Sequence, residues 1–314
     1  MSKPHADSLK ILDVTLRDGG YRNNFNFSED CIKTIISKLS DANIDFIEVG
    51  YRNGSFKPIK NIGITGISDD NYLTLVHQII RSARTSVIYH PKNVNEQDIV
   101  RMNQLGVDML RCCYDLNNTE NSLKYIQLTK ELGMISCVNF TRISKLPRNI
   151  LIQHLKLLQY TGVDVIYLAD SNGSLTPEVT ANLVKTVKDT IDVEVGFHAH
   201  NNLHLAIANA VCAIDNGATF IDCSLRGMGK GAGNLQTEFW IAYLMKMYND
   251  YKYDLGIILE LVDYLAQHHI ESSPEISTID IMSGLLDMSI EEKHKLSKMN
   301  FTSLNTDVAN LSFC

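Results

Sequence analysis

The chain has 314 residues and a formal net charge of -7, which fits one large domain, or one barrel with a small appendage, better than two ordinary domains. Its apolar fraction of 45% allows a sizeable buried core. The negative charge argues against non-specific nucleic-acid binding, which needs clustered positive charge. The first residues carry no apolar signal core, and no apolar run approaches the length of a membrane span. We therefore expect a cytoplasmic protein with neither a nucleic-acid nor a membrane partner.

The seven cysteines are odd in number, and none lies in a Cys-x-x-Cys pair. A disulfide framework is therefore not expected, and a reducing compartment fits better. Cys112 and Cys113 stand in an apolar stretch, where buried and inert thiols are the ordinary outcome.

Eight short β-branched or apolar runs recur along the chain, separated by longer segments with helical spacing. Strands that alternate with helices pair in parallel through right-handed crossovers. Eight such units over about 250 residues are the expected size of a closed (β/α)8 barrel, or TIM barrel; an open doubly wound sheet is the alternative. The predicted strands are Ile11–Leu16, Asp45–Val49, Ser86–Tyr89, Met109–Cys113, Ile135–Phe140, Asp164–Leu168, Val193–Phe197 and Thr219–Leu225.

Three predicted helices are followed by Gly133, Gly162 and Gly217, which suit left-handed caps before the next strand. No strand pattern continues beyond about residue 250. We therefore expect the catalytic barrel over residues 1–250 and a short helical C-terminal extension over residues 251–314. Helical spacing is clearest over Cys31–Leu39, Leu123–Leu132, Leu151–Tyr160, Val179–Val187 and, in the extension, Leu255–His268.

Histidine and carboxylate residues follow two of the predicted strands, and (β/α)8 barrels carry their chemistry at the carboxyl ends of the strands. The seventh strand continues into His198-Ala199-His200, and residues two apart in a strand point the same way. Asp18 follows the first strand, which lies close to the seventh in a closed barrel. Two imidazoles and one carboxylate make an incomplete coordination shell for a divalent metal ion. The alternative is a structural role, which is usual for a single histidine.

A glycine-rich segment from Gly227 to Asn234 follows the eighth strand. It matches a relaxed dinucleotide fingerprint, but that fold needs a further strand and an acidic residue beyond it. We interpret the segment as a flexible lid, or as a loop of backbone amides over the barrel mouth. A plain glycine-rich turn is the alternative.

Taken together, these motifs resemble the metal-dependent lyase and aldolase barrels related to 3-hydroxy-3-methylglutaryl-CoA lyase and isopropylmalate synthase. The branch of the 4-hydroxy-2-oxovalerate aldolases is the most similar. The resemblance covers roughly residues 9–245. It rests on Asp13-Val14-Thr15-Leu16-Arg17-Asp18-Gly19, on Asp170-Ser171-Asn172, on His198-Ala199-His200-Asn201-Asn202 and on the segment from Gly227 to Asn234.

The resemblance implies a divalent-metal-dependent lyase that forms or cleaves a carbon–carbon bond next to a 2-oxo acid, with a 4-hydroxy-2-oxo acid as substrate and an aldehyde as the second partner. It implies that Arg17 stabilises the enolate oxygen and that Ser171 contacts the 2-oxo acid. It also implies a Mn²⁺ or Mg²⁺ ion held by Asp18, His198 and His200, with Asn234 as a further ligand or as a group behind the ligands.

The sequence departs from the aldolase pattern at the proton-transfer site. The aldolases carry a histidine three residues after the metal-binding aspartate, and Tyr21 stands there in this chain. An unperturbed tyrosine has a pKa of about 10, whereas histidine suits proton transfer near neutrality. His90, at the end of the third predicted strand, is therefore our leading candidate for the base, with Tyr21 as its rival.

Arginines fall in or just after several predicted strands, although the whole chain is acidic. Because arginine binds carboxylate and phosphate through a bidentate fork, we expect an aldehyde that is anionic or sugar-linked, with Arg142 among the substrate-binding residues. Salt bridges along the barrel rim are the alternative for some of them. The five arginines are Arg22, Arg52, Arg111, Arg142 and Arg226.

Two other functions remain open from the sequence. One is a Claisen-type synthase that condenses an acyl-CoA with a 2-oxo acid, although such enzymes usually carry additional C-terminal domains. The other is a non-catalytic binding barrel, against which the intact Arg17, Asp18, His198 and His200 argue. We also expect a homodimer.

Overall fold

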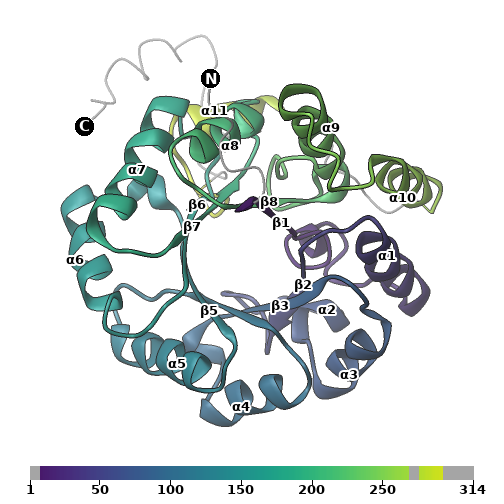
Figure 1. Cartoon of the computed structure of the whole chain (residues 1–314), viewed down its shortest axis with the longest axis horizontal. Coiled ribbons are helices and arrows are strands. Elements are labelled where there is room, and N and C mark those ends of the chain that lie inside the picture. Colours follow the sequence, from purple (N-terminus) through teal and green to yellow (C-terminus); the bar gives the residue numbers. More distant parts are fainter. Residues whose placement is uncertain (1–7, 269–275, 293–314) are drawn as a thin grey trace.

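Eight parallel strands close into one barrel in the computed structural model, which describes residues 8–268 and 276–292 (Figure 1). Each strand pairs with the next along the chain, and β8 pairs with β1. The predicted (β/α)8 barrel is confirmed, and the open-sheet alternative is wrong because the first and last strands are hydrogen-bonded. The strands are β1 (Lys10–Asp13), β2 (Phe46–Arg52), β3 (Arg84–Tyr89), β4 (Met109–Cys113), β5 (Ile135–Phe140), β6 (Val165–Asp170), β7 (Glu194–Ala199) and β8 (Phe220–Cys223).

The predicted strands β4 and β5 have the observed bounds, whereas β1 ends three residues before the predicted end. The carboxylate of Asp13 accepts a hydrogen bond from the Thr15 amide at 2.9 Å, and the Asp18 amide donates to the Val14 carbonyl at 2.8 Å. These local bonds turn the chain away from the sheet. Asp18 therefore lies in a turn after β1 and not in the strand itself.

Helices cover the outside of the barrel, and the glycines predicted to end three of them have left-handed backbone, with φ values of 81° at Gly133, 73° at Gly162 and 104° at Gly217. The α-helices are α1 (Glu29–Asp41), α2 (Ile64–Ile67), α3 (Asp70–Ile79), α4 (Glu96–Gln104), α5 (Thr119–Glu131), α6 (Arg148–Leu158), α7 (Pro177–Thr190), α8 (Ala206–Asp215), α9 (Thr237–Tyr248), α10 (Leu255–Gln267) and α11 (Thr278–Leu285).

The interior of the barrel is layered, and the layers follow the two-residue period of the strands. The amino-terminal layer is apolar and includes Phe46, Met109 and Phe220. Two residues further along the same strands, the next layer is charged and contains Glu48, Arg111 and Asp222, all completely or almost completely buried. The functional pocket lies beyond this charged layer, at the carboxyl ends of the strands.

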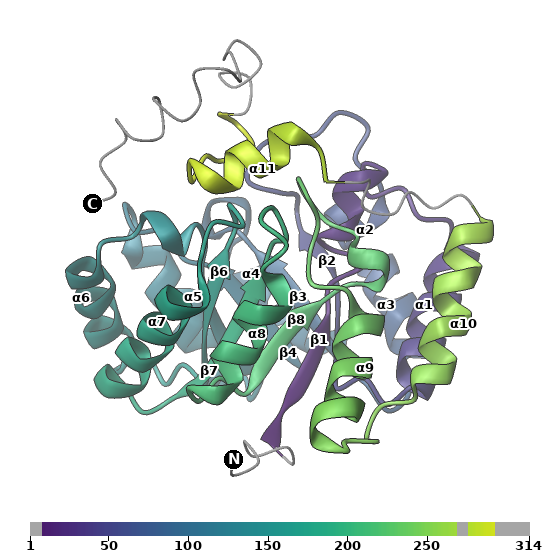
Figure 2. The ribbon, with the colours of Figure 1, turned by 90° about the horizontal axis from the view of Figure 1, so that it is seen from above.

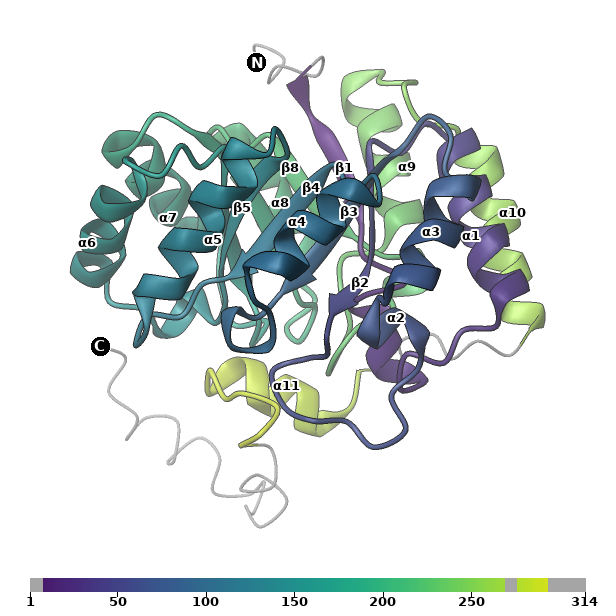
Figure 3. The same ribbon diagram turned by 90° about the horizontal axis from the view of Figure 1, so that it is seen from below.

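The chain after α9 contributes two helices with different positions. α10 packs against α1 on the side of the barrel, whereas α11 lies across the carboxyl end of the barrel (Figures 2 and 3). Residues 269–275 and 293–314 of the expected extension lie outside the described residues, so the division at residue 250 stays a prediction. Within the two described ranges, none of the helices combines the length and the apolar character that a membrane crossing requires.

We predict that Gly196→Ala destabilises the barrel. A Cβ atom at this position would lie 2.4 Å from the Tyr167 ring, and that ring stacks on Arg111 with 3.8 Å between the guanidinium carbon and the ring centroid. Overpacking of this kind costs about 1–3 kcal/mol, measurable as a lower free energy of unfolding in urea. Gly256→Ala, in the first turn of α10, is the control and should be neutral or slightly stabilising. Equal unfolding midpoints for the two variants would contradict the proposed packing.

Candidate metal centre and substrate pocket

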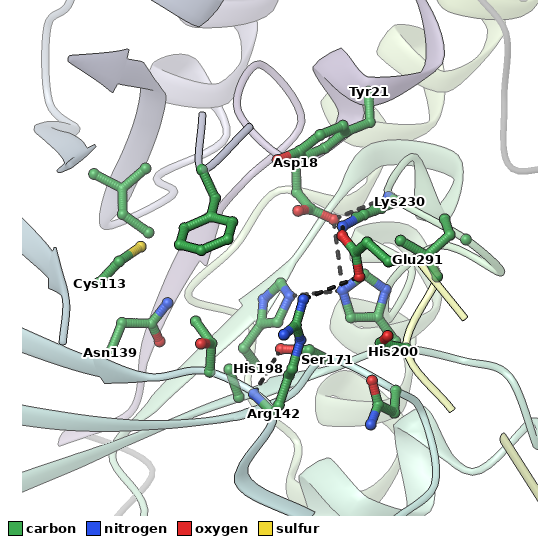
Figure 4. A pocket seen from close by; sticks show the side chains of 18 of the residues that line it. Asp18, Tyr21, Cys113, Asn139, Arg142, Ser171, His198, His200, Lys230 and Glu291 are labelled. Carbon is green, nitrogen blue, oxygen red and sulfur yellow. Dashed lines mark hydrogen bonds and ion pairs between the residues drawn. The ribbon is translucent and has the colours of Figure 1, made fainter. Parts of the chain in front are cut away.

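A pocket opens at the carboxyl end of the barrel (Figure 4), and Ser283 of α11 and Glu291 beyond it are among the residues that line it. Its floor carries the histidines of β7 and the turn after β1, and its rim includes residues of the C-terminal segment. The residues that line the pocket include Arg17, Asp18, Tyr21, Tyr51, His90, Asn139, Arg142, Ser171, His198, His200, Lys230 and Glu291.

Asp18, His198 and His200 come together on the pocket floor. One ligand atom from each lies within 4.8 Å of those of the other two. The two Nε2 atoms are 3.3 Å apart, and the His200 Nε2 atom is 3.8 Å from Oδ2 of Asp18. The structure thus brings together the three residues that the sequence pattern predicts as metal ligands.

The hydrogen bonds of the two imidazoles orient their free nitrogens toward each other. Nδ1 of His198 lies 3.0 Å from the Asp222 carboxylate, and Nδ1 of His200 lies 3.1 Å from the Gly233 carbonyl oxygen. Since both partners are acceptors, each Nδ1 carries the proton and each Nε2 presents a lone pair. Burial lowers the pKa of His200 to about 4, so its ring is neutral at physiological pH. Two facing lone pairs beside a carboxylate fit a divalent cation.

Asp18 is held in its ionised form. Burial alone would raise the pKa of Asp18, but the Arg17 guanidinium, the two histidines and the Asn234 hydrogen bond together outweigh this effect and lower the pKa below its ordinary value. Nη1 of Arg17 donates to Oδ1 at 2.6 Å, while the backbone amide of Lys230 donates to Oδ2 at 3.2 Å. A Cβ atom at Gly229 would lie 2.8 Å from Oδ2. The glycine-rich loop therefore approaches Asp18 closely and donates a backbone amide to it. This agrees with the prediction of a loop of backbone amides over the barrel mouth.

Asn234 stands directly behind Asp18. Its Nδ2 atom donates to Oδ2 of Asp18 at 3.0 Å and to the Met228 carbonyl at 2.9 Å. Its Oδ1 atom is buried without a hydrogen-bond partner among the described residues. An unpartnered buried amide oxygen is costly, and it suits the role of a further metal ligand.

A chain of buried ion pairs connects Asp18 to His198 through the barrel interior. Arg17 contacts both Asp18 and Glu48. Arg111 continues the chain, at 2.9 Å from Glu48 and 2.7 Å from Asp222, and Asp222 ends it at His198. The three carboxylates and two guanidiniums carry a formal charge of -3 + 2 = -1. An uncompensated buried charge is unfavourable, so this cluster favours an added cation.

Glu48 and Asp222 are not among the site residues predicted from the sequence. The available signal was the presence of single charged residues inside apolar strand runs, at Phe46-Ile47-Glu48-Val49 and at Phe220-Ile221-Asp222-Cys223. Charged side chains in such runs are buried only when they are paired. Their partners could not be named, because the pairing joins β2, β4 and β8.

Three residues that line the pocket each have a buried polar atom without a partner among the described residues. These atoms are Nη2 of Arg17, Oδ1 of Asn139 and Oδ1 of Asn172. Ser171 also lines the pocket, where its hydroxyl accepts a hydrogen bond from the Arg142 amide at 3.0 Å. A donor, an acceptor and a hydroxyl are therefore available for a small polar substrate.

Both candidates for the base line the pocket. Burial and the charge of Lys92 lower the pKa of His90 to about 4, so this imidazole is neutral at physiological pH. Its ring stacks on Tyr51 at 5.7 Å between centroids. The Tyr21 hydroxyl bonds to Ser55, and burial raises the pKa of Tyr21. His90 therefore has a lone pair available for a proton, but its lowered pKa makes it a weaker base than an ordinary histidine, whereas Tyr21 is a neutral donor.

Among the five arginines predicted to bind an anionic substrate, only Arg142 lines the pocket. Arg52 and Arg111 are buried in ion pairs. Arg52 pairs with Asp70 and Asp98, and Arg111 pairs with Glu48 and Asp222. Arg22 donates to the Gly231 carbonyl at 2.5 Å. For Arg52 and Arg111 the salt-bridge alternative is thus correct, because carboxylates of neighbouring helices and strands already pair with their guanidinium groups.

The HMGL-like family model matches residues 8–265. The chain belongs to the HMGL-like family. The resemblance inferred from the four motifs is therefore confirmed.

Curated relatives cover most of the chain. The chain is 34% identical to a 4-hydroxy-2-oxovalerate aldolase of Carboxydothermus hydrogenoformans over 82% of this chain and 77% of that protein. It is 29% identical to the enzyme of the same name from Desulfitobacterium hafniense, over 88% and 83% of the two chains.

Among solved structures, the N-terminal domain of a Bacteroides vulgatus protein assigned provisionally as an aldolase is similar, with a TM-score of 0.83 and 29% identity. The match covers 95% of this chain and all of that one. The Bacillus subtilis HMG-CoA lyase matches with a TM-score of 0.70 at 18% identity, over 85% of this chain and 95% of the lyase. This second likeness concerns the fold alone.

We predict that His200→Ala abolishes metal binding and leaves the fold intact. A ligand that binds only the folded state raises the melting temperature by mass action, so Mn²⁺ should raise Tm by several degrees in the unaltered protein and not in the variant. Thermal unfolding with and without Mn²⁺ measures this. The control is His204→Asn at an exposed histidine with φ of 56°, since asparagine tolerates left-handed backbone. Equal stabilisation of His200→Ala by Mn²⁺ would locate the metal elsewhere.

Proposed function

We propose that the protein is a divalent-metal-dependent aldolase, a carbon–carbon lyase that forms or cleaves the bond between a 2-oxo acid enolate and an aldehyde, with a 4-hydroxy-2-oxo acid as substrate. The observation that best supports this proposal is that Nη2 of Arg17 has no hydrogen-bond partner among the described residues, beside the candidate metal ligands Asp18, His198 and His200. The names of the aldolase relatives support the same reaction class.

Cleavage next to a ketone leaves negative charge on the ketone oxygen, and the site must stabilise that charge. A bound Mn²⁺ or Mg²⁺ ion would act as a Lewis acid on the oxygens of the 2-oxo acid. Arg17 keeps its Nε and Nη1 atoms on Glu48 and Asp18, so its Nη2 atom is free to donate to the developing enolate oxygen. A donor fixed in advance by two buried carboxylates requires no reorganisation as the charge forms. Ser171 and Arg142 would bind the substrate beside it.

Cleavage also requires a base for the proton of the 4-hydroxyl group. We assign this role to His90, which is neutral at physiological pH and lines the pocket. Tyr21 remains the rival, either as an acid that returns the proton or as a substrate-binding group. The stack of His90 on Tyr51 fixes the imidazole plane.

We further propose an anionic or sugar-linked aldehyde as the second substrate, since Arg142 and Lys230 both stand at the pocket rim. None of the six cysteines in the described part of the chain forms a disulfide, which supports a reducing compartment such as the cytoplasm. The expected homodimer stays a prediction.

The decisive experiment is proton exchange into pyruvate. When the protein, pyruvate and Mn²⁺ are incubated in D2O, we expect the pyruvate methyl signal to decrease in the NMR spectrum, and excess chelator should prevent this. Arg17→Lys keeps the charge but loses the planar fork, so its exchange rate should fall by about two orders of magnitude, as removal of an oxyanion donor commonly does. Arg81→Lys, at an exposed arginine paired with Asp41, is the matched control. Exchange that persists in chelator would contradict the proposed chemistry.

We predict that His90→Ala and Tyr21→Phe separate the two candidate bases. Loss of the base should suppress aldol cleavage much more than metal-assisted enolisation of pyruvate, because only cleavage requires deprotonation of the hydroxyl group. Cleavage and pyruvate exchange are therefore both measured for each variant. If His90→Ala cleaves at the original rate while Tyr21→Phe is inactive, the assignment of His90 is wrong.

A further inference from the structure

The rim of the pocket holds a carboxylate of the protein itself. Glu291 lies between Arg142 and Lys230 (Figure 4), and each of its two oxygens meets one cation at 2.9 Å. Burial tends to raise the pKa of Glu291, but the hydrogen bond and charge of Lys230, with that of Arg142, lower it to about 2. An ionised carboxylate therefore pairs with two of the cations that line the pocket.

The cations come from opposite sides of the barrel mouth. Arg142 follows β5, and its amide donates to Ser171 after β6, whereas Lys230 belongs to the glycine-rich loop after β8. Arg142 has left-handed backbone, with φ 53° and ψ 44°. This conformation costs a residue with a Cβ atom about 1 kcal/mol or more. Such positions persist where the surroundings impose them, often at ligand-binding sites.

The segment that carries Glu291 is attached to the barrel by a separate set of contacts. The carboxylate of Asp287 accepts hydrogen bonds from Ser144 and Ser174 at 2.7 Å and from Asn172 at 2.8 Å. Four residues further, the contacts of Glu291 with Arg142 and Lys230 are at the pocket itself. The displacement of Glu291 from the pocket therefore requires movement only of the chain beyond the Asp287 anchor.

We propose that Arg142 and Lys230 form an anion-binding subsite for a carboxylate or phosphate on the aldehyde part of the substrate, and that Glu291 occupies this subsite until such an anion displaces it. The geometry supports this because the two cations already bind both oxygens of one carboxylate. The proposal names the substrate class of the aldolase site, and its kinetic test rests on the proposed function. A neutral aldehyde gains nothing from the displacement and leaves Glu291 in position.

An internal competitor reduces the apparent affinity to the fraction of subsite that stays open, since the apparent Kd is the intrinsic Kd divided by that fraction. If Glu291 fills the subsite nine-tenths of the time, its removal lowers the apparent Kd about tenfold. Glu291→Gln keeps the shape and removes the charge. It should therefore favour anionic aldehydes selectively.

The kinetic test compares three aldehydes as partners of pyruvate: 4-oxobutanoate, glyceraldehyde 3-phosphate and neutral butanal. We expect Glu291→Gln to lower KM for at least one anionic aldehyde by about tenfold and to change KM for butanal by less than about twofold. A preference between the first two identifies carboxylate or phosphate as the natural group. Glu292→Gln is the matched control, because Glu292 belongs to the same segment but its carboxylate bonds to Ser289. Equal effects of both variants, or equal effects on all aldehydes, would overturn the proposal.

A second test needs no catalysis, so it separates this inference from the proposed function. Amide hydrogen exchange is followed by mass spectrometry with succinate, inorganic phosphate or sodium chloride at matched ionic strength. We expect succinate or phosphate to accelerate exchange in residues 288–292, with little change in α11. In Glu291→Gln, exchange there should be fast without added anion and respond no further. If neither anion affects these residues, the subsite is not an exchangeable anion site, whatever the outcome of the pyruvate assay.

Discussion

The ion pairs that run from Asp18 through Arg17, Glu48, Arg111 and Asp222 to His198 organise the rest of the site. Burying charges is expensive unless each is paired, and here each charged group contacts an opposite charge, with one negative charge left for a cation. The chain begins and ends at metal-ligand candidates. The same contacts that satisfy the buried charges therefore also fix the direction of the carboxylate and of one imidazole.

This arrangement links the packing of the barrel to its chemistry. The ring of Tyr167 lies over the Arg111 guanidinium, and Gly196 leaves the space that the ring requires. The Arg17 guanidinium has two nitrogens committed to carboxylates and one directed elsewhere. A rigid arginine with one available donor is the kind of preorganised group that stabilises an enolate. Its rigidity depends on the charged layer beneath it.

The upper side of the pocket is built differently. Its cover is the segment from α11 to Glu291, which belongs to the chain beyond the eight βα units and is attached by polar contacts at Asp287 and Ser283. The Ser283 contact with Asn202 is buried, whereas the two ion pairs of Glu291 at the rim are partly exposed, and exposed ion pairs are individually weak. The floor of the site is thus fixed by buried charge, and its cover ends at partly exposed ion pairs.

The sequence by itself determined the alternation of strands and helices, the left-handed glycine caps and the histidine pair at the end of β7, because each depends on a local period or spacing. It did not give the end of β1, where the Asp13 side chain competes with the sheet. Only the tertiary structure joined Glu48 to Asp222 through Arg111 and brought Glu291 over the mouth. These pairings join strands on different sides of the barrel and segments about 150 residues apart. The local spacing of residues in the sequence does not indicate which distant charges form ion pairs.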